Sequence, residues 1–259
     1  MDIERDTEAA RAQYGRQAAQ YTASASHAAG PDLARLLELL ALSGEETVLD
    51  VATGTGHTAL AISAYARSVI GVDPTPEMLA EAEKLASSRG ITNVRFVLGQ
   101  AERLPFDDAS FDVVTVRRAP HHFQSIPQAL GEMHRVLKAG GKLGLIDQLT
   151  AREPSGVELL ERFEKWRDPS HVRALNVPEW REALAEAGFA VLHVEVDEER
   201  RTLRSYFDIA GTAQPDRDGI VAMLHAADQS ALQSFGYSSE PGPEGSFLKE
   251  RVIILASRT

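Results

Sequence analysis

Through residues 1–150, apolar residues form short continuous runs separated by longer segments in which they recur every three or four positions. The runs are rich in β-branched residues and apolar on both faces, which is typical of parallel strands covered on both sides. The segments between them predict helices, including one from Pro76 to Gly90 and one from Ile126 to the glycine pair Gly140 and Gly141. Strands are expected at 47–52, 68–73, 93–99, 111–116 and 142–147. This order predicts an α/β fold built on a doubly wound parallel sheet.

The second half of the chain is less regular. A helix that ends at Gly188 is followed by a strand, and "ERVIILASR" predicts a last strand. Between these strands, 203–235 holds two helical patterns around Pro215 and is longer than a tight hairpin requires. We expect one domain over 1–259, with an N-terminal helical cap at 1–40, a cofactor-binding core at 41–150 and a substrate lid formed by 151–180 and 203–247.

The composition narrows the class of protein. The 259 residues are 43% hydrophobic, which is enough for the core of one domain with insertions. The 27 Lys and Arg against 38 Asp and Glu give a net charge of -11 without a basic patch, which argues against nucleic acid or an anionic membrane as partner. Cysteine is absent, the charged start lacks the apolar stretch of a secretory signal, and no run is long enough to span a membrane. We therefore expect a cytoplasmic protein, either monomeric or homodimeric.

The stretch "VLDVATGTGHTALAIS" at 48–63 predicts a strand, a glycine turn and a helix. Gly54, Gly56 and Ala59 satisfy the dinucleotide pattern G-x-G-x-x-A, with Asp73 about twenty residues on as a ribose ligand. Asp50, at the strand end, would lie where a pyrophosphate must pass, and it suits a cationic amino-acid ligand better. It could also be a simple turn or cap residue.

Several ordered segments carry a resemblance to a known family. "VLDVATGTG", "GVDPTPEML", "GQAERLPFDDASFDVV", "HHF" and "HRVLKAGGKLGLID" resemble the successive motifs of class I S-adenosylmethionine-dependent methyltransferases, in particular the type-11 and ubiquinone/menaquinone C-methyltransferase-like group. The resemblance extends from Tyr14 to about Asp147, and weakly to Phe189. Ala139 stands where the family often has proline. The resemblance implies a Rossmann-like, mostly parallel seven-stranded sheet whose last strand is antiparallel, and S-adenosylmethionine as cofactor.

The resemblance assigns cofactor contacts to residues at the ends of successive strands. The glycines let the backbone approach the ligand, Asp73 accepts both ribose hydroxyls, and the N-terminal segment covers the cofactor from above. Met78 could instead be ordinary core, Glu102 a surface charge, and the tyrosines mere helix packing. The expected cofactor-binding residues are Tyr14, Tyr21, Asp50, Ala52, Thr53, Gly54, Gly56, Asp73, Pro74, Thr75, Met78, Gln100, Ala101, Glu102 and Arg117.

Methyl transfer from a sulfonium is an in-line displacement, so a base is needed only if the acceptor must lose a proton. His121 and His122 follow the fourth strand and are candidates for that base, and His27 for a residue above the site. Arg117 could bind an acidic oxygen of the acceptor or form a structural ion pair. No metal site is expected.

Aromatic and sulfur-containing residues in the lid segments could shape an apolar cavity for a small aromatic or isoprenoid-like acceptor, or could be core: Phe163, Trp166, Trp180, Tyr206, Phe207, Met223 and Phe235. Because the lid has no basic cluster along the chain, a highly phosphorylated acceptor is disfavoured. Carbon or oxygen methylation is favoured. The alternatives are a protein of this fold that does not methylate, either a binding module or another enzyme, and a nicotinamide-dependent oxidoreductase.

Overall fold

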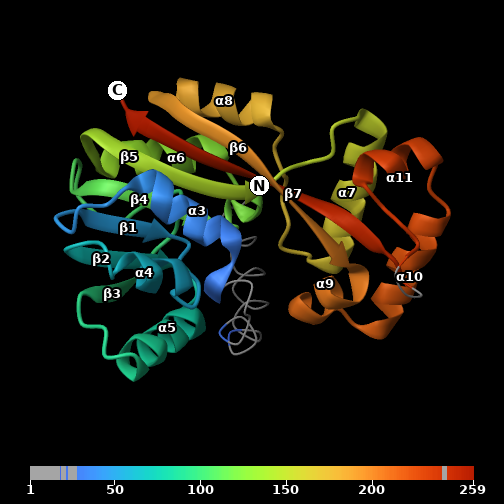
Figure 1. The fold of residues 1–259 in the computed structure, drawn as a ribbon, viewed down its shortest axis with the longest axis horizontal. Coiled ribbons are helices and arrows are strands. Elements are labelled where there is room, and N and C mark those ends of the chain that lie inside the picture. The colour runs from blue at the N-terminus through green and yellow to red at the C-terminus, as the bar shows by residue number, and fades with distance from the viewer. Residues whose placement is uncertain (1–17, 19–21, 23–27, 241–243) are drawn as a thin grey trace.

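The computed structural model describes residues 18, 22, 28–240 and 244–259 (Figure 1). Its centre is a seven-stranded sheet in the order β3-β2-β1-β4-β5-β7-β6. All neighbouring pairs are parallel except those of β7, which runs antiparallel to β5 and β6. The strands are β1 (Thr47–Val51), β2 (Ser68–Asp73), β3 (Val94–Leu98), β4 (Phe111–Arg117), β5 (Leu137–Gln148), β6 (Phe189–Thr202) and β7 (Ser246–Arg258). The predicted mostly parallel sheet with an antiparallel last strand is confirmed.

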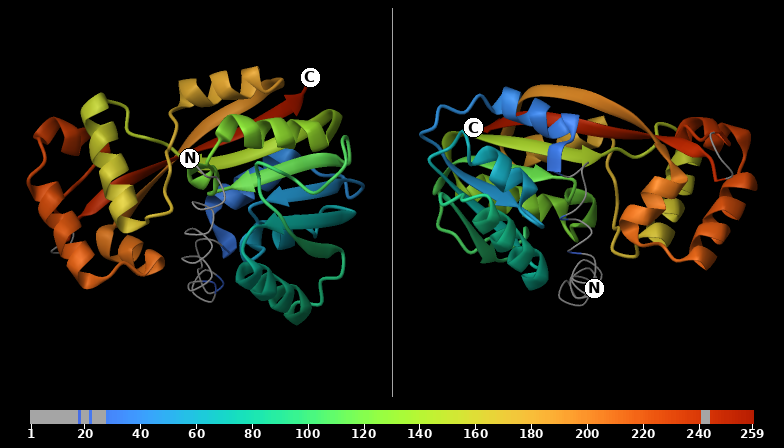
Figure 2. Two further views of the ribbon diagram at one scale, coloured as in Figure 1. Left: turned by 180° about the vertical axis from the view of Figure 1, so that it is seen from behind. Right: turned by 60° about the horizontal axis from the view of Figure 1, so that its bottom comes forward.

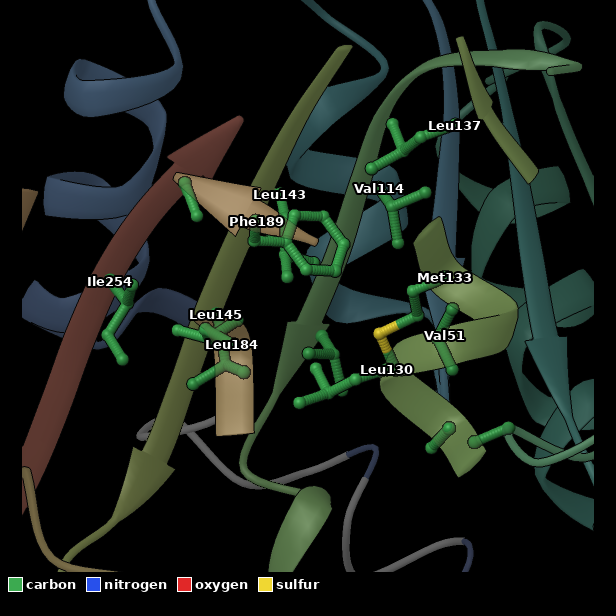
Figure 3. Packing of buried hydrophobic residues seen from close by; sticks show 14 of the residues in the cluster. Val51, Val114, Leu130, Met133, Leu137, Leu143, Leu145, Leu184, Phe189 and Ile254 are labelled. Atoms are coloured by element: carbon green, nitrogen blue, oxygen red, sulfur yellow. The ribbon is translucent and has the colours of Figure 1, made fainter. Parts of the chain in front are cut away.

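Helices cover both faces of the sheet. On one face, α3 (Pro31–Leu40) and α4 (His57–Ile62) pack with Val48, Val69 and Val113. On the other face, α6 (Ile126–Val136) and α8 (Val177–Glu186) pack with the alternate strand residues, among them Leu49 and Val114. Figure 3 shows this second layer, in which Leu130 and Met133 of α6 meet the strands. The strand sequences are apolar on both faces because helices cover both faces of the sheet. α5 (Pro76–Ser88) packs beside β3 and β2.

Two predictions in this region need correction. The helix expected to reach Gly140 ends at Val136, because Leu137 adopts an extended backbone and pairs with Phe111 at the start of a longer β5. The run at 93–99 was expected to be covered on both faces, but β3 is an edge strand and Leu98 is 54% exposed.

β6 and β7 continue past the sheet as a two-stranded ribbon, which we define as 198–202 paired with 246–250. The ribbon leads into a second group of helices, here called the helical lobe: α7 (Pro154–Arg167), α9 (Leu203–Ala210), α10 (Gln214–His225) and α11 (Gln229–Phe235). Both views in Figure 2 show this lobe beyond the ends of the parallel strands, where β6 and β7 continue. The segment 203–235 thus holds three helices where two were predicted, because Gly211 and Ala226 each end a helix.

The helical lobe has a hydrophobic core of its own. Phe163 packs against Phe235 and Phe247 with ring centroids 5.1 and 5.5 Å apart. The expected lid segment 151–180 is divided between the helical lobe and the sheet. Its helix α7 belongs to the lobe, whereas its last residues belong to α8 and Trp180 is fully buried in the sheet core. Within the described residues, no helix is long and apolar enough to cross a membrane.

Gly56→Ala tests the packing behind the glycine turn. Gly56 has a φ of 81°, and a Cβ there would lie 2.9 Å from Phe96 and 3.0 Å from Ala82. Strain and collision together should lower the free energy of unfolding by about 2 kcal/mol or more. Gly131→Ala is the control, since a Cβ at that helical position meets nothing within 4 Å and should add about 0.5–1 kcal/mol. Urea unfolding measures both, and equal stabilities would contradict the packing described.

Candidate active site

The turn after β1 combines an open face with a closed one. Gly54 has a φ of 55°, and a Cβ there would meet nothing within 4 Å. Gly56 is packed against protein on the far side, so its missing Cβ serves internal packing. The space beside Gly54 is therefore open to a ligand. At Gly56, which was also expected to approach the cofactor, the corresponding space is filled by Phe96 and Ala82.

Asp50 fastens the turn to the sheet. Its carboxylate accepts hydrogen bonds from the Thr53 hydroxyl at 2.6 Å and the Thr115 hydroxyl at 2.7 Å. Burial raises the pKa of Asp50 to about 6, although both hydroxyls and the charge of Arg117 favour the ionised form. A nearby cationic group would favour ionisation further, which agrees with the expectation of a cationic ligand.

Asp73 joins the glycine turn to the loop after β2. Its Oδ2 accepts the amide of Gly54 at 2.9 Å, and its Oδ1 accepts the amide of Thr75 at 2.9 Å. Asp73 is therefore held in one orientation at the end of β2, in the position expected of a ribose ligand.

A cavity of about 240 Å³ lies at the carboxyl ends of the strands, between the sheet and the helical lobe. His121 and His122 line it together with most of the residues expected to bind cofactor. Gly56 is not part of the wall, and Tyr14, Tyr21 and His27 lie outside the described residues. The expected residues in the wall are Asp50, Ala52, Thr53, Gly54, Asp73, Pro74, Thr75, Met78, Gln100, Ala101, Glu102 and Arg117.

Glu102 has a structural partner as well as a place in the wall. Its carboxylate accepts the backbone amide of Gln124 at 2.9 Å, and its own carbonyl accepts a hydrogen bond from Gln128. It therefore ties the loop after β3 to the start of α6, and is not merely a surface charge.

Arg117 forms the structural ion pair that was one of its two interpretations. Its guanidinium donates Nε and Nη2 to the two oxygens of Asp32, each at 2.9 Å, and Arg118 makes the same pair of contacts. Burial alone would raise the pKa of Asp32, but the two guanidiniums outweigh it and hold the pKa well below its usual range. Sequence reasoning missed Asp32, which lies in the first turn of α3.

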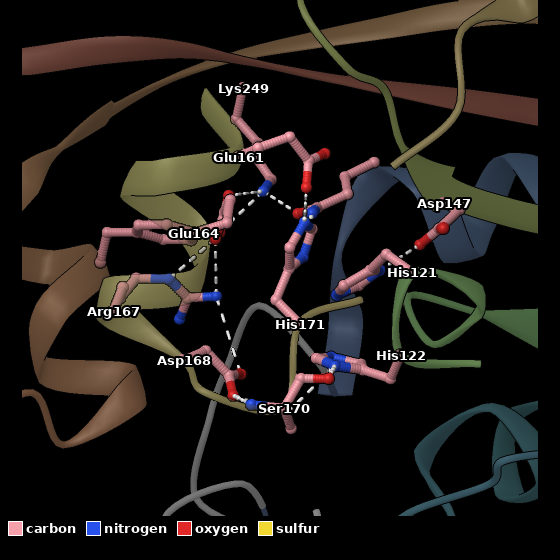
Figure 4. Close-up of polar contacts among 12 residues, drawn as sticks. His121, His122, Asp147, Glu161, Glu164, Arg167, Asp168, Ser170, His171 and Lys249 are labelled. Atoms are coloured by element: carbon pink, nitrogen blue, oxygen red, sulfur yellow. Dashed lines mark hydrogen bonds and ion pairs between the residues drawn. The ribbon is translucent and has the colours of Figure 1, made fainter. Parts of the chain in front are cut away.

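His121 is held by a carboxylate at the end of β5. Its Nδ1 lies 2.5 Å from Asp147 Oδ1, and both side chains are buried (Figure 4). Burial raises the pKa of Asp147 to about 7, while burial and the charge of His171 lower the pKa of His121 well below its usual value. His121 also lines the cavity. Asp147 was not among the predicted site residues, although it ends a predicted strand 26 residues after His121.

His122 has a different environment. Its Nδ1 contacts the hydroxyl of Ser170 at 3.1 Å, and Ser170 in turn donates to Asp168. Burial and then repulsion by His121 lower the pKa of His122. The two rings lie 4.0 Å apart by centroid; Nδ1 of His121 contacts Asp147, whereas Nδ1 of His122 contacts Ser170.

A buried charged network fastens the helical lobe to the sheet. Lys249 on β7 donates to Glu164 of α7 at 2.8 Å, to the Tyr206 hydroxyl at 2.7 Å, and to Gln148 of β5. Arg167 pairs with the same Glu164 at 2.9 Å. Burial alone would raise the pKa of Glu164, but the charges of Lys249 and Arg167 hold it well below its usual value. Figure 4 shows these groups converging from α7 and β7.

Cations gather on the wall of the cavity, contrary to the expectation of no basic cluster. They come from β4, α7 and the β6–β7 pair, and their separation along the chain hid them from the sequence pattern. The charged alternation "DEERRT" opposite "SFLKER" was the available signal, because it predicts a two-stranded ribbon with paired charges. The cationic wall residues are Arg117, Arg118, Arg167, Arg201, Lys249 and Arg251.

The aromatic residues expected to shape an apolar cavity are mostly core. Phe163, Phe207 and Phe235 are buried inside the helical lobe, with Met223 packed against them, and Trp166 is 42% exposed. Only Tyr206 of that expected set lies in the wall. The helical lobe needs these side chains for its own stability, since each contributes about 1.5–3 kcal/mol by burial.

Comparison with known proteins shows the family to which the chain belongs. Residues 49–145 match the family model described as Methyltransferase domain. The chain is 34% identical to YcgJ of Bacillus subtilis, named an uncharacterized methyltransferase, over 93% of this chain and 96% of that protein. It is 40% identical over 115 residues to the demethylmenaquinone methyltransferase of Thermus thermophilus, which is 44% of this chain and 52% of that protein.

Solved structures agree with these sequence matches. The crystal structure of YcgJ superposes with a TM-score of 0.83 at 33% identity, over 88% of this chain and 97% of that one. A putative methyltransferase from Bacillus halodurans gives a TM-score of 0.85 at 33% identity, over 89% and 100%. The sheet order, the glycine turn and these relatives together define a class I S-adenosylmethionine-dependent methyltransferase. More particularly, the chain belongs to the methyltransferase family that includes YcgJ, with menaquinone C-methyltransferases among its further homologues.

Asp73→Ala tests the assignment of the ribose ligand. Removing the carboxylate should weaken the binding of S-adenosylhomocysteine by about 1–3 kcal/mol, because a charged hydrogen-bond acceptor is lost. Calorimetric titration measures the change. Asp107→Ala, at a surface loop away from the cavity, should leave the affinity unaltered. If Asp73→Ala and the unaltered protein bound S-adenosylhomocysteine equally well, Asp73 would not be the ribose ligand.

Asp32→Asn tests the buried ion pair. Two guanidiniums lose their carboxylate, so the free energy of unfolding at about pH 7 should fall by about 3–5 kcal/mol. Because the pKa of Asp32 is lowered in the folded state, its contribution is full above its unfolded pKa of about 4 and is lost as the pH falls toward the folded value. Urea unfolding at about pH 7 and about pH 3 should therefore show a smaller difference at the lower pH. A difference that is absent at neutral pH, or that grows on acidification, would contradict the ion pair.

Proposed function

We propose that the protein transfers a methyl group from S-adenosylmethionine to a carbon or oxygen atom of a small molecule, with His121 as the general base. The observation that carries the proposal is a single cavity lined by the glycine turn and Asp73 together with the His121–Asp147 pair. Ligands of open α/β sheets bind at the carboxyl ends of the strands, where this cavity lies.

The residues of the cavity fit the proposed cofactor. The open backbone at Gly54 admits close approach, Asp73 is positioned for the ribose hydroxyls, and Asp50 supplies negative charge near the amino-acid end. Met78, Gln100 and Ala101 would enclose the adenine. When bound, S-adenosylmethionine supplies an electrophilic methyl group and a sulfur leaving group.

The His121–Asp147 pair can accept a proton from the acceptor. With Asp147 ionised, its carboxylate accepts Nδ1–H and leaves a lone pair on Nε2, which is the geometry of a histidine general base. Nε2 takes the proton of a hydroxyl or an acidic carbon as the acceptor attacks the methyl carbon. Asp147 stabilises the resulting imidazolium, which then returns its proton to solvent. The deep burial of the pair excludes water that would compete for these hydrogen bonds.

Cofactor titration and acceptor screening test the proposal together. S-adenosylmethionine and S-adenosylhomocysteine should bind by calorimetry, with NAD as the control that does not. Small phenols and enolisable carbon acids should then be screened for release of S-adenosylhomocysteine above the rate without acceptor. Binding of NAD alone would revive the oxidoreductase alternative. Binding of S-adenosylmethionine with no turnover across both acceptor classes would favour a protein that does not methylate.

The two neighbouring histidines provide a matched pair of variants. His121→Gln should keep the affinity for S-adenosylhomocysteine and lower kcat about a hundredfold or more, because general base catalysis contributes about 10²–10⁴. His122→Gln should retain most of the turnover, since its Nδ1 contacts Ser170 and not Asp147. If the two variants were equally active, or if His122→Gln were the inactive one, the assignment would fail.

The dependence of the methyl-transfer rate on pH should reflect ionisation of the His121–Asp147 pair. The pair has a lone pair on Nε2 only after it loses the proton shared with Asp147, whose pKa burial raises to about 7. The rate should therefore rise with pH through an apparent pKa near 7 and level off above it. In Asp147→Asn this limb should disappear along with most of the activity. A rate that is flat from about pH 6 to about pH 9 would exclude titration of this pair.

A further inference from the structure

The face of the ribbon that meets the cavity carries a buried cation, Arg201, which shares its carboxylate partner with another arginine. Arg201 is 8% exposed and lies in the wall. Its Nε is buried and, within the described chain, has no hydrogen-bond partner. Glu199 Oε2 lies 2.9 Å away, but outside hydrogen-bonding geometry. Glu199 balances the charge of Arg201, and the Arg201 guanidinium forms part of the cavity wall, where it can donate to a bound molecule.

The nearest carboxylate is already engaged. Glu199 Oε2 accepts a hydrogen bond from Arg251 Nη2 at 2.8 Å, and Arg251 also contacts Asp197. The side chain of Glu199 is 43% exposed, whereas those of Arg201 and Arg251 are 9% and 5% exposed. The carboxylate thus reaches toward solvent, while the guanidiniums remain on the buried side with the cavity.

Other cations lie in the same part of the cavity wall, each with a carboxylate partner. On the facing strand the register partner of Arg201 is Phe247, and Lys249 and Arg251 follow two and four residues later, opposite Glu199 and Asp197. Both also line the cavity. Burial and Arg117 lower the pKa of Arg118 to about 9, and the charge of Arg251 contributes. The chain as a whole has a net charge of -11, so a cationic pocket wall is a local arrangement and not the average of the surface.

We propose that the methyl acceptor is a small acid whose oxyanion, a carboxylate or a phosphate, is bound by the guanidinium of Arg201. The planar fork of arginine matches either group with two parallel hydrogen bonds. The proposal rests on the proposed function, since it assigns the acceptor end of the same cavity. It differs from the expectation that a highly phosphorylated acceptor is disfavoured, because the cations of the wall come from separate segments.

Matched acidic and neutral probes test the proposal. Benzoate, phenyl phosphate and the neutral benzamide are titrated into the protein, with and without saturating S-adenosylhomocysteine. We expect benzoate or phenyl phosphate to bind at least about tenfold more tightly than benzamide, and the stronger of the two identifies the oxyanion. The preference should weaken as sodium chloride is raised, while benzamide binding stays constant. This salt dependence requires no variant.

Neighbouring arginines on opposite faces of β6 give the control. Arg201→Gln should abolish the preference for the acid, and Arg201→Lys should restore part of it. Arg200→Gln should retain the preference, because Arg200 is exposed and contacts Gly236 and Ser246. Affinity for S-adenosylhomocysteine should be unchanged in all three variants.

The outcomes separate the two proposals. Equal binding of the acids and benzamide, no binding of either acid, or a preference that survives Arg201→Gln would overturn the acidic acceptor. Failure of S-adenosylhomocysteine to bind would overturn the proposed function instead. The preference for an acid can be measured without that ligand, so the two failures are distinguishable.

Discussion

The extension of β6 and β7 beyond the sheet is the constraint on which the site depends. β6 is parallel to β5, so its continuation carries the chain past the carboxyl ends of the parallel strands, where ligands of such sheets bind. A two-stranded ribbon is marginally stable by itself, and here Phe247 anchors it in the aromatic core of the helical lobe. The length of the ribbon therefore sets where the lobe stands over the glycine turn and His121.

Buried charged groups connect the helical lobe to the sheet and α3 to the end of β4. Lys249 contacts Gln148 of the sheet and Glu164 of the lobe, while Asp32 of α3 receives both Arg117 and Arg118. Burying such pairs yields little net stability, because desolvation offsets most of their attraction, but removing one partner is strongly destabilising. We interpret these pairs as devices that fix the walls of the cavity, and the apolar cores as the source of stability.

The sequence was most informative where function depends on local backbone. The order of strands and helices up to Asp147, the glycine turn and the acid Asp73 follow from periodicity and from motifs that occupy a few consecutive residues. The sequence was least informative where function depends on residues far apart in the chain. Asp147 pairs with His121 across 26 positions and Asp32 with Arg117 across 85, and neither distance leaves a pattern. The charged ribbon was missed because "DEERR" reads as solvated chain until its pairing partner is known.

A crystal structure of the protein with S-adenosylhomocysteine tests the central claim most directly. The account predicts the ribose on Asp73, the adenine beside Met78, and the sulfur facing the part of the cavity lined by His121. A ligand bound outside this cavity, or one whose sulfur points away from His121, would contradict the assignment of cofactor and base to a single site.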